Sequence, residues 1–122
     1  MSSIKQVVWV GNSLTELRAF PEEVKDVVGY ALNAVQEGSH PRSAKPLKGF
    51  KFPVMEMVSD YNTNTYRSVY TIQFDEAVYV LYCFQKKSVW GIKTPKPDIN
   101  LIKQRLKRAE EIHKEELIHE HT

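Results

Sequence analysis

Residues 66–84 read YRSVYTIQFDEAVYVLYCF, and this stretch decides the fold. Along residues 66–74 successive side chains alternate between two faces, as they do in a β-strand. Asp75 and Glu76 interrupt the alternation as a hairpin turn would, and residues 77–84 return as a mostly apolar strand. The stretch therefore predicts an antiparallel hairpin. One face of its first strand carries Tyr66, Ser68, Tyr70, Ile72 and Phe74, and the other carries Arg67, Val69, Thr71 and Gln73.

Two further strands are predicted upstream of the hairpin. Residues 54–58 (VMEMV) follow Pro53 and have the length and composition of a short strand. Residues 5–10 (KQVVWV) are rich in β-branched and aromatic side chains and stop at Gly11, a turn signal. The chain is thus expected to begin with a strand and to form a three-stranded antiparallel meander from residue 54 onward.

Helices are predicted between and after these strands. Ser13 with Glu16 three residues later is a capping-box pattern for a short helix. Pro21 suits the first turn of a longer helix, which Gly38 ends. Asp98 can cap a final helix. The predicted order of a strand, two helices, three antiparallel strands and a helix indicates the α+β class, with helices on one face of the sheet.

The 122 residues are enough for one domain whose core needs no disulfide or metal. We expect a single domain over residues 1–122, with an acidic helix or tail from about residue 110. No stretch approaches the ~20 apolar residues that cross a bilayer, and the N-terminus does not resemble a signal peptide. The single cysteine, Cys83, lies in an apolar strand and is expected to be a small buried side chain. A cytoplasmic protein is the simplest interpretation.

Charge is distributed unevenly along the chain. Residues 40–108 hold thirteen Lys or Arg and five acidic residues, a balance of +8, whereas residues 1–39 sum to −2 and residues 109–122 to −4. A concentrated basic region attracts phosphate backbones through the release of counterions. The middle of the chain therefore favours a polyanionic ligand, although a solvated basic face is the alternative reading.

The hairpin places several of these cations together. If the chain turns at Asp75 and Glu76, Arg67 lies opposite position 84 or beyond, and therefore close to Lys86 and Lys87. Like charges in contact cost stability unless an anion, water or a carboxylate relieves them. Clustered cations also lower the pKa of a lysine and can prepare it for proton transfer. The alternative is a strand end whose charges point apart into solvent.

Aromatic and imidazole side chains add less information. Trp90 follows the lysine pair and is a candidate for an exposed surface on which an RNA base stacks. His113, His119 and His121 have no common zinc spacing, and no second cysteine assists them. We therefore expect neither a metal nor a cofactor.

The order of the motifs resembles the RelE/HigB superfamily of toxins from type II toxin–antitoxin systems, and most of all its phage-derived HigB-like branch. The resemblance covers about residues 5–110. It rests on KPLKG at residues 45–49, MEM at 55–57, YRSVY at 66–70, VLYCFQKK at 80–87, KTP at 93–95 and the basic helix that follows.

The resemblance implies a compact RelE-like microbial RNase fold and a metal-independent endoribonuclease that cleaves mRNA on the ribosome. The ribose 2′-hydroxyl attacks the adjacent phosphate and leaves a 2′,3′-cyclic phosphate and a 5′-hydroxyl. The implied partners are the ribosome, mRNA and a HigA-like antitoxin with a helix-turn-helix domain; no membrane is involved.

The same resemblance assigns roles to individual residues. Arg67 matches the arginine that stabilises the phosphorane charge, and Lys48 matches a base or phosphate ligand. Lys86 and Lys87 match residues that hold the scissile phosphate or protonate the leaving group. SVWGIKTP (residues 88–95) stands where some members have a C-terminal active-site tyrosine or histidine, so the general acid is unassigned. Further contacts to RNA are expected from Lys45, Lys51, Trp90, Lys93 and Arg105.

Two alternatives share the same basic face. The chain could be a non-catalytic regulator that binds nucleic acid, or an inactive toxin homologue that serves as an interaction module. Loss of cleavage with retention of tight nucleic-acid binding would separate the first alternative from the enzyme.

Overall fold

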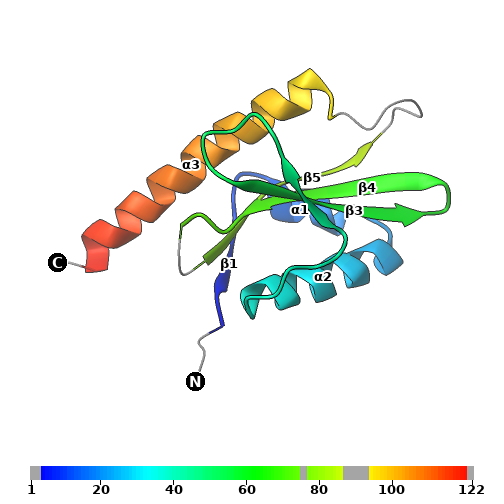
Figure 1. Cartoon of the computed structure of the whole chain (residues 1–122), viewed down its shortest axis with the longest axis horizontal. Helices are drawn as coiled ribbons and strands as arrows, with labels where there is room; N and C mark the ends of the chain where they lie inside the picture. Colours follow the sequence, from blue (N-terminus) through cyan, green and yellow to red (C-terminus); the bar gives the residue numbers. More distant parts are fainter. Residues whose placement is uncertain (1–3, 75–76, 87–93, 121–122) are drawn as a thin grey trace.

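The computed structural model describes residues 4–74, 77–86 and 94–120. Within these residues the strands form one five-stranded sheet with the order β1-β5-β4-β3-β2 (Figure 1). β1 runs parallel to β5, and the other neighbours are antiparallel. The strands are β1 (Gln6–Trp9), β2 (Ala44–Leu47), β3 (Val54–Tyr61), β4 (Asn64–Thr71) and β5 (Ala77–Lys86).

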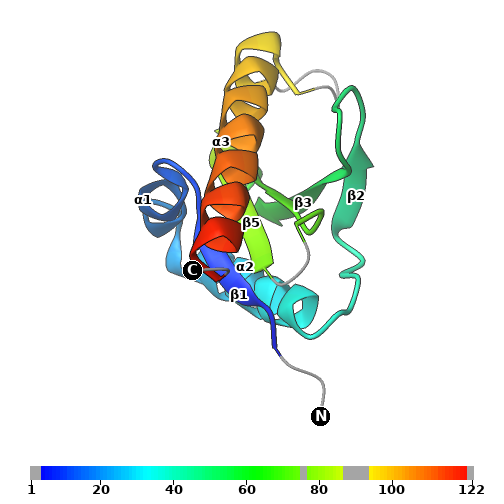
Figure 2. The ribbon, with the colours of Figure 1, turned by 90° about the vertical axis from the view of Figure 1, so that its left-hand side faces the viewer.

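The helices of the described segments cover both faces of this sheet. α1 (Ser13–Arg18) and α2 (Glu22–Gln36) share one apolar core with the sheet, and α3 (Lys96–Glu120) shares another on the opposite face (Figures 1 and 2). The α+β class is confirmed, but the prediction of helices on one face was wrong. Both faces of the central strands are apolar, so each face needs its own cover.

The antiparallel part of the sheet is larger than the sequence predicted. In the described chain it has four strands rather than three, because β2 pairs with β3 from Ala44–Met57 to Leu47–Val54. Pro46 cannot donate a backbone hydrogen bond, and it is tolerated because β2 is an edge strand. This added strand brings Lys45 opposite Glu56.

The predicted β4–β5 hairpin is confirmed in its pairing. Arg67 lies opposite Phe84, and Thr65 lies opposite Lys86. β4 ends at Thr71 rather than at residue 74, and the predicted turn residues Asp75 and Glu76 lie outside the described residues.

A β-bulge interrupts this pairing between Val69 and Tyr70, where the partner on β5 changes from Tyr82 to Val80. The extra residue is Leu81. As a result both Leu81 and Tyr82 contribute to the core beneath α3, although they are consecutive in sequence. The bulge therefore turns the second half of β5 so that Tyr82 faces α3.

The helix starts differ in detail from the predictions. Asn12 occupies the N-cap of α1, and Ser13 is its first, buried residue, so the expected capping box does not form. Pro21 is the N-cap residue of α2, and α3 begins at Lys96, which leaves Asp98 inside its first turn. Across residues 4–74, 77–86 and 94–120, none of the helices has the length and apolar character that a membrane span requires.

Candidate functional site

A buried ion pair lies on the face of the sheet that α3 covers. Arg67 on β4 and Glu56 on β3 are only 3% and 1% exposed. The Nη1 of Arg67 donates to Oε1 of Glu56, and Oγ1 of Thr94 donates to Oε2 of the same carboxylate at 3.0 Å. In the part of the chain that the structure describes, the Nε of Arg67 is buried without a hydrogen-bond partner.

The strand register explains why these side chains meet. Lys45 pairs with Glu56 across β2 and β3, and Val58, two residues after Glu56, pairs with Arg67. Lys86 lies two residues after Phe84, the partner of Arg67, and so points to the same face. Lys45, Arg67 and Lys86 therefore surround Glu56 from three strands; we call these four residues the cationic cluster.

Lys86 is the member of the cluster whose protonation is most affected. Lys86 is 8% exposed. Burial lowers the pKa of the Lys86 ammonium, and the positive charges of Arg67 and Lys45 lower it further, while the Glu56 carboxylate opposes them. A lysine with a lowered pKa exchanges its proton more readily near neutral pH than an exposed lysine does.

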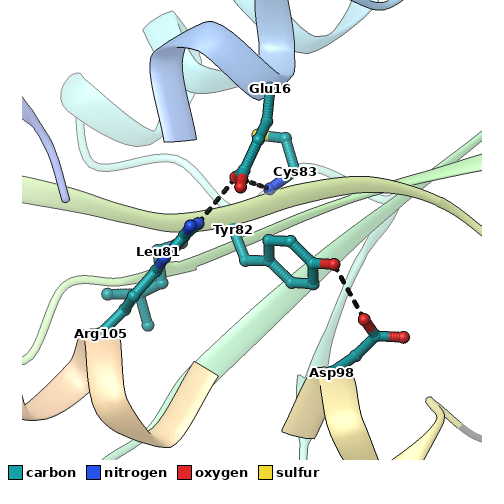
Figure 3. Close-up of polar contacts among 6 residues, drawn as sticks. All are labelled: Glu16, Leu81, Tyr82, Cys83, Asp98 and Arg105. Atoms are coloured by element: carbon teal, nitrogen blue, oxygen red, sulfur yellow. Dashed lines mark hydrogen bonds and ion pairs between the residues drawn. The ribbon is translucent and has the colours of Figure 1, made fainter. Parts of the chain in front are cut away.

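A second network of charged residues joins α1, β5 and α3 (Figure 3). The Nη1 of Arg105 on α3 donates to Oε1 of Glu16 on α1 at 2.7 Å and to the carbonyl of Leu81 at 2.9 Å. The same Glu16 oxygen accepts a hydrogen bond from the backbone N–H of Cys83 at 3.2 Å. Glu16 and Arg105, together with the β5 backbone groups to which they bind, are called the tether.

The tether binds backbone groups of β5 that β1 does not reach. β1 pairs with β5 from Gln6–Ala77 to Trp9–Val80, so the edge of β5 beyond Val80 has no β1 residue beside it. Arg105 and Glu16 satisfy the Leu81 carbonyl and the Cys83 N–H on that edge, and buried backbone groups require such partners. Gly11, at φ +56°, leaves room for this, because a Cβ there would lie 3.0 Å from Nε of Arg105.

Tyr82 links the tether to the start of α3. Its hydroxyl donates to Oδ1 of Asp98 at 2.8 Å, and its ring lies 5.2 Å from the guanidinium carbon of Arg105 (Figure 3). Burial raises the pKa of the Tyr82 phenol, and donation to the Asp98 carboxylate raises it further. Tyr82 therefore remains a neutral hydrogen-bond donor at physiological pH.

A family model described as Phage derived protein Gp49-like (DUF891) matches residues 15–107, from α1 to the middle of α3. The chain belongs to this family. The Gp49-like family is associated with RelE-like toxins of toxin–antitoxin systems, so the resemblance seen in the motifs is confirmed at that level. The matched segment contains both the cationic cluster and the tether. No curated protein matches the chain.

The structure of this Gp49-like protein brings together only part of the predicted site. Arg67 and Lys86 are neighbours as predicted, and Lys45 joins them. Lys48 is exposed and follows β2 at the end that pairs with Val54, away from the Lys45–Glu56 pair. Lys87, Trp90 and Lys93 lie outside the described residues.

Lys51 and Arg105 have surroundings unlike those expected of RNA contacts. Lys51 lies over the ring of Phe52 at 5.2 Å. It also lines a surface hollow together with four residues of α3, two of them acidic: Lys107, Glu110, Glu111 and Lys114. Arg105 belongs to the tether, where its guanidinium is used internally. The contact from Lys51 to RNA stays a prediction, and for Arg105 the tether is the alternative to the predicted RNA contact.

Glu56 is the site residue that sequence reasoning missed. It appeared there only as the centre of the MEM motif, yet it is the carboxylate that relieves the clustered cations. A signal was present in the alternation: the neighbours of Glu56 on its own strand face are Val54 and Val58, and Val54 is 1% exposed. A single acid on an apolar strand face requires a buried partner, and the nearby Arg67 supplies it.

Candidate metal ligands are few in the described structure. Among residues 4–74, 77–86 and 94–120, no group of three or more His, Cys, Asp or Glu side chains is arranged to hold a metal ion. The charged residues of the cluster are instead mostly cationic, an arrangement that suits a phosphate ligand.

Cys83 is expected to react slowly with thiol reagents in the folded protein. It is 2% exposed, and burial raises the pKa of its thiol to about 12. Because the thiolate is the reacting form, its population near pH 8 falls on the order of 1,000-fold below that of a free cysteine. Absorbance after addition of Ellman's reagent should stay near baseline until guanidinium is added. Rapid labelling of the native protein would contradict this buried position.

Proposed function

We propose that this Gp49-like protein is the toxin of a type II toxin–antitoxin system, of the RelE/HigB kind, and that it cleaves mRNA on the ribosome. The observation that carries the proposal is the convergence of Lys45, Arg67 and Lys86 on one face of the sheet. Membership of a family associated with RelE-like toxins supports it.

The proposed reaction needs cations more than any other chemical group. The 2′-hydroxyl loses its proton to a general base, a role for which Lys48 is one candidate. Its oxygen then forms a bond to phosphorus as the bond to the 5′-oxygen breaks, and negative charge accumulates on the phosphorane. Preorganised donors aimed at developing charge are usually the largest contribution to catalysis. Arg67 is proposed to stabilise that charge, and Lys86 to hold the scissile phosphate or protonate the leaving 5′-oxygen. Lys48, which is exposed, suits a ligand of a neighbouring phosphate.

The proposed partners come from the family resemblance, and the basic surface suits them. The ribosome and its mRNA are the substrate complex, which places the protein in the cytoplasm. We propose that the antitoxin is a HigA-like protein with a helix-turn-helix domain, and that it is acidic where it contacts the basic face. Such complementarity speeds association and weakens with added salt.

Cleavage in ribosome-containing extract is expected to yield RNA with 2′,3′-cyclic phosphate and 5′-hydroxyl ends. Cleavage should continue when a chelator is present, provided that the integrity of the ribosomes is confirmed separately, because the proposed chemistry uses side-chain cations. End-group analysis of the purified fragments makes the measurement. Strict dependence of the cleavage step on added magnesium would reject this mechanism.

A regulator that binds nucleic acid without cleaving it is the second candidate. The burial of Arg67 favours this candidate, because its guanidinium is already paired with Glu56 in the free protein and is not exposed to a substrate phosphate. Tight binding of RNA or DNA with no cleavage on or off the ribosome would support this candidate. Absence of both binding and cleavage would instead favour an inactive homologue that acts through protein contacts.

A further inference from the structure

A hollow of about 500 Å³ lies between the α1–α2 corner and the strands β4 and β5. Its size is within the range of pockets that bind small molecules. Most of the residues around it are apolar or aromatic, and none belongs to the cationic cluster: Glu16, Ala19, Phe20, Pro21, Tyr66, Cys83, Phe84 and Gln85. Because three consecutive residues of β5 form one of its walls, we call it the edge hollow.

The edge hollow is close to electrically neutral. Among the described residues that line it, Glu16 is the one with a charge, and Nη1 of Arg105 lies 2.7 Å from its Oε1. The rings of Phe20 and Tyr66 pack edge to face at a centroid distance of 4.9 Å and form part of the apolar wall. A neutral apolar group therefore suits the hollow, whereas a phosphate would find no cation among these lining residues.

Beside the hollow, the outer edge of β5 has backbone groups that no strand covers. β1 pairs with β5 only as far as Val80. The Cys83 N–H points away from β4, because it donates to Glu16 (Figure 3). Every second residue of a strand points its N–H and C=O to the same side, so the Cys83 carbonyl and both backbone groups of Gln85 also point outward. Between described residues, no hydrogen bond to these three groups is found.

The opposite edge of the sheet, formed by β2, is closed to strand pairing. The carbonyl of Ser43 accepts a hydrogen bond from the N–H of Val58 on β3, so the backbone groups of Ala44 and Pro46 point outward. The Ala44 N–H donates to the carbonyl of Pro41, and Pro46 has no N–H. The outer edge of β2 therefore offers no backbone donor to another chain, whereas the edge of β5 does.

The outward groups of β5 fit an added strand that runs parallel to it, as β1 already does. In a parallel pair, one residue of the added strand donates to the carbonyl before the residue opposite it and accepts from the N–H after that residue. With Phe84 as the residue opposite, these partners are the Cys83 carbonyl and the Gln85 N–H. A twofold pair of β5 edges from two copies is antiparallel and also needs the Cys83 N–H, which Glu16 occupies. The edge therefore suits a different chain better than a second copy.

We propose that the edge hollow and the adjoining edge of β5 form a docking site for a partner protein. An extended segment of the partner runs parallel to β5, bonds to Cys83 and Gln85, and places one neutral apolar side chain in the hollow. Side chains alternate along such a segment, so the residue next to the one opposite Phe84 lies on the face of Tyr66 and Cys83. Backbone pairing supplies affinity in this mode of recognition, and a side-chain pocket supplies specificity. The site does not depend on the ribonuclease function proposed above.

An uncharged capped peptide, acetyl-STYTS-amide, is the probe in an NMR titration of the isotope-labelled protein. Its tyrosine fits the hollow when one of its threonines lies opposite Phe84. The backbone amide signals of Ala19, Phe20 and Gln85 are expected to shift, with a dissociation constant on the order of 1 mM. Acetyl-STATS-amide, which lacks the ring, should bind at least about tenfold more weakly. Equal affinity of the two peptides would overturn the role of the hollow.

The backbone bonds are tested from both chains. Gln85→Pro removes the outward N–H without removing a bond to β4 and should abolish binding, whereas Gln85→Ala keeps that N–H and should bind like the parent protein. N-methylation of both threonines of the probe removes the donor to the Cys83 carbonyl and should also abolish binding. This second measurement decides the point if Gln85→Pro does not fold. Undiminished binding of the N-methylated peptide would overturn strand addition.

A filled hollow should also block the probe. Ala19→Trp places a ring in the hollow from an exposed position and is expected to weaken peptide binding about tenfold or more. Arg18→Trp is the matched control: it adds the same ring at an exposed neighbour that does not line the hollow, and it should leave the affinity unchanged. Equal affinities of the two variants would contradict insertion of the tyrosine.

Other occupants of the surface give different results. An oligouridylate that shifts the Ala19 and Gln85 signals when the peptide does not would assign the surface to RNA. A dimer in sedimentation equilibrium that Gln85→Pro converts to a monomer would assign it to a second copy. Either result, or the absence of any shift with about 10 mM peptide, would overturn the proposal.

Discussion

Replacement of Arg67 by alanine is expected to remove most toxicity and to destabilise the protein. Loss of one preorganised donor costs about 100- to 1,000-fold in rate. The same change leaves the buried carboxylate of Glu56 without its main partner, and breaking a buried ion pair costs about 3–5 kcal/mol. Cell growth after induction reports the first effect, and urea unfolding followed by circular dichroism reports the second.

The two effects can be separated with a charge-neutral pair. Glu56→Gln combined with Arg67→Gln removes both buried charges, and such replacements are often close to neutral for stability. This double variant should fold and still be inactive. Arg18→Ala, at the exposed end of α1, is the control and should keep both toxicity and stability. A folded double variant with full toxicity would reject Arg67 as a catalytic residue.

The position of Arg67 beside Lys86 could be predicted because it depends on one local pattern. Alternation along residues 66–84 and a single hairpin fix which residues of β4 and β5 lie opposite one another. The family resemblance then supplied their roles. Lys45 was predicted only as a contact to RNA; its place beside Glu56 required β2, a four-residue edge strand with a proline in it, whose pattern is weak.

Other parts of the site depend on contacts that no local pattern contains. Glu16 fits a capping box by its spacing to Ser13, yet its carboxylate binds Arg105, 89 residues away, and Cys83, 67 residues away. The bulge at Leu81 changes which side of β5 faces α3, and alternation alone does not place it. Tertiary contacts here override the local signal.

The protein thus uses two Arg–Glu pairs in different ways. Arg67 and Glu56 are buried, and the charges of both, with that of Lys45, act on the nearby Lys86. Arg105 and Glu16 are partly exposed, at 12% and 22% of the side chain, and their partners are backbone groups of β5. The first arrangement holds a buried guanidinium in a fixed position, and the second satisfies backbone groups at the edge of the sheet.

Arg105→Ala is therefore expected to lower stability without lowering activity per folded molecule. It removes a charged hydrogen bond to Glu16 and leaves the Leu81 carbonyl unsatisfied, which costs about 2–3 kcal/mol. In a domain of this size that corresponds to a fall in Tm of roughly 6–12 °C. Thermal unfolding of the variant measures it, and Lys103→Ala, an exposed cation on the same helix, should leave Tm unchanged.

A double-mutant cycle with Glu16→Gln tests whether the two residues act together. Because Arg105 and Glu16 are ion-pair partners, the effects of the two substitutions on the free energy of unfolding should not be additive. We expect a coupling of about 1–3 kcal/mol. RNA binding by the folded fraction of Arg105→Ala should equal that of the parent protein. If Tm is unchanged while RNA affinity falls severalfold, Arg105 contacts RNA as the basic helix first suggested, and the tether is not what holds α1, β5 and α3 together.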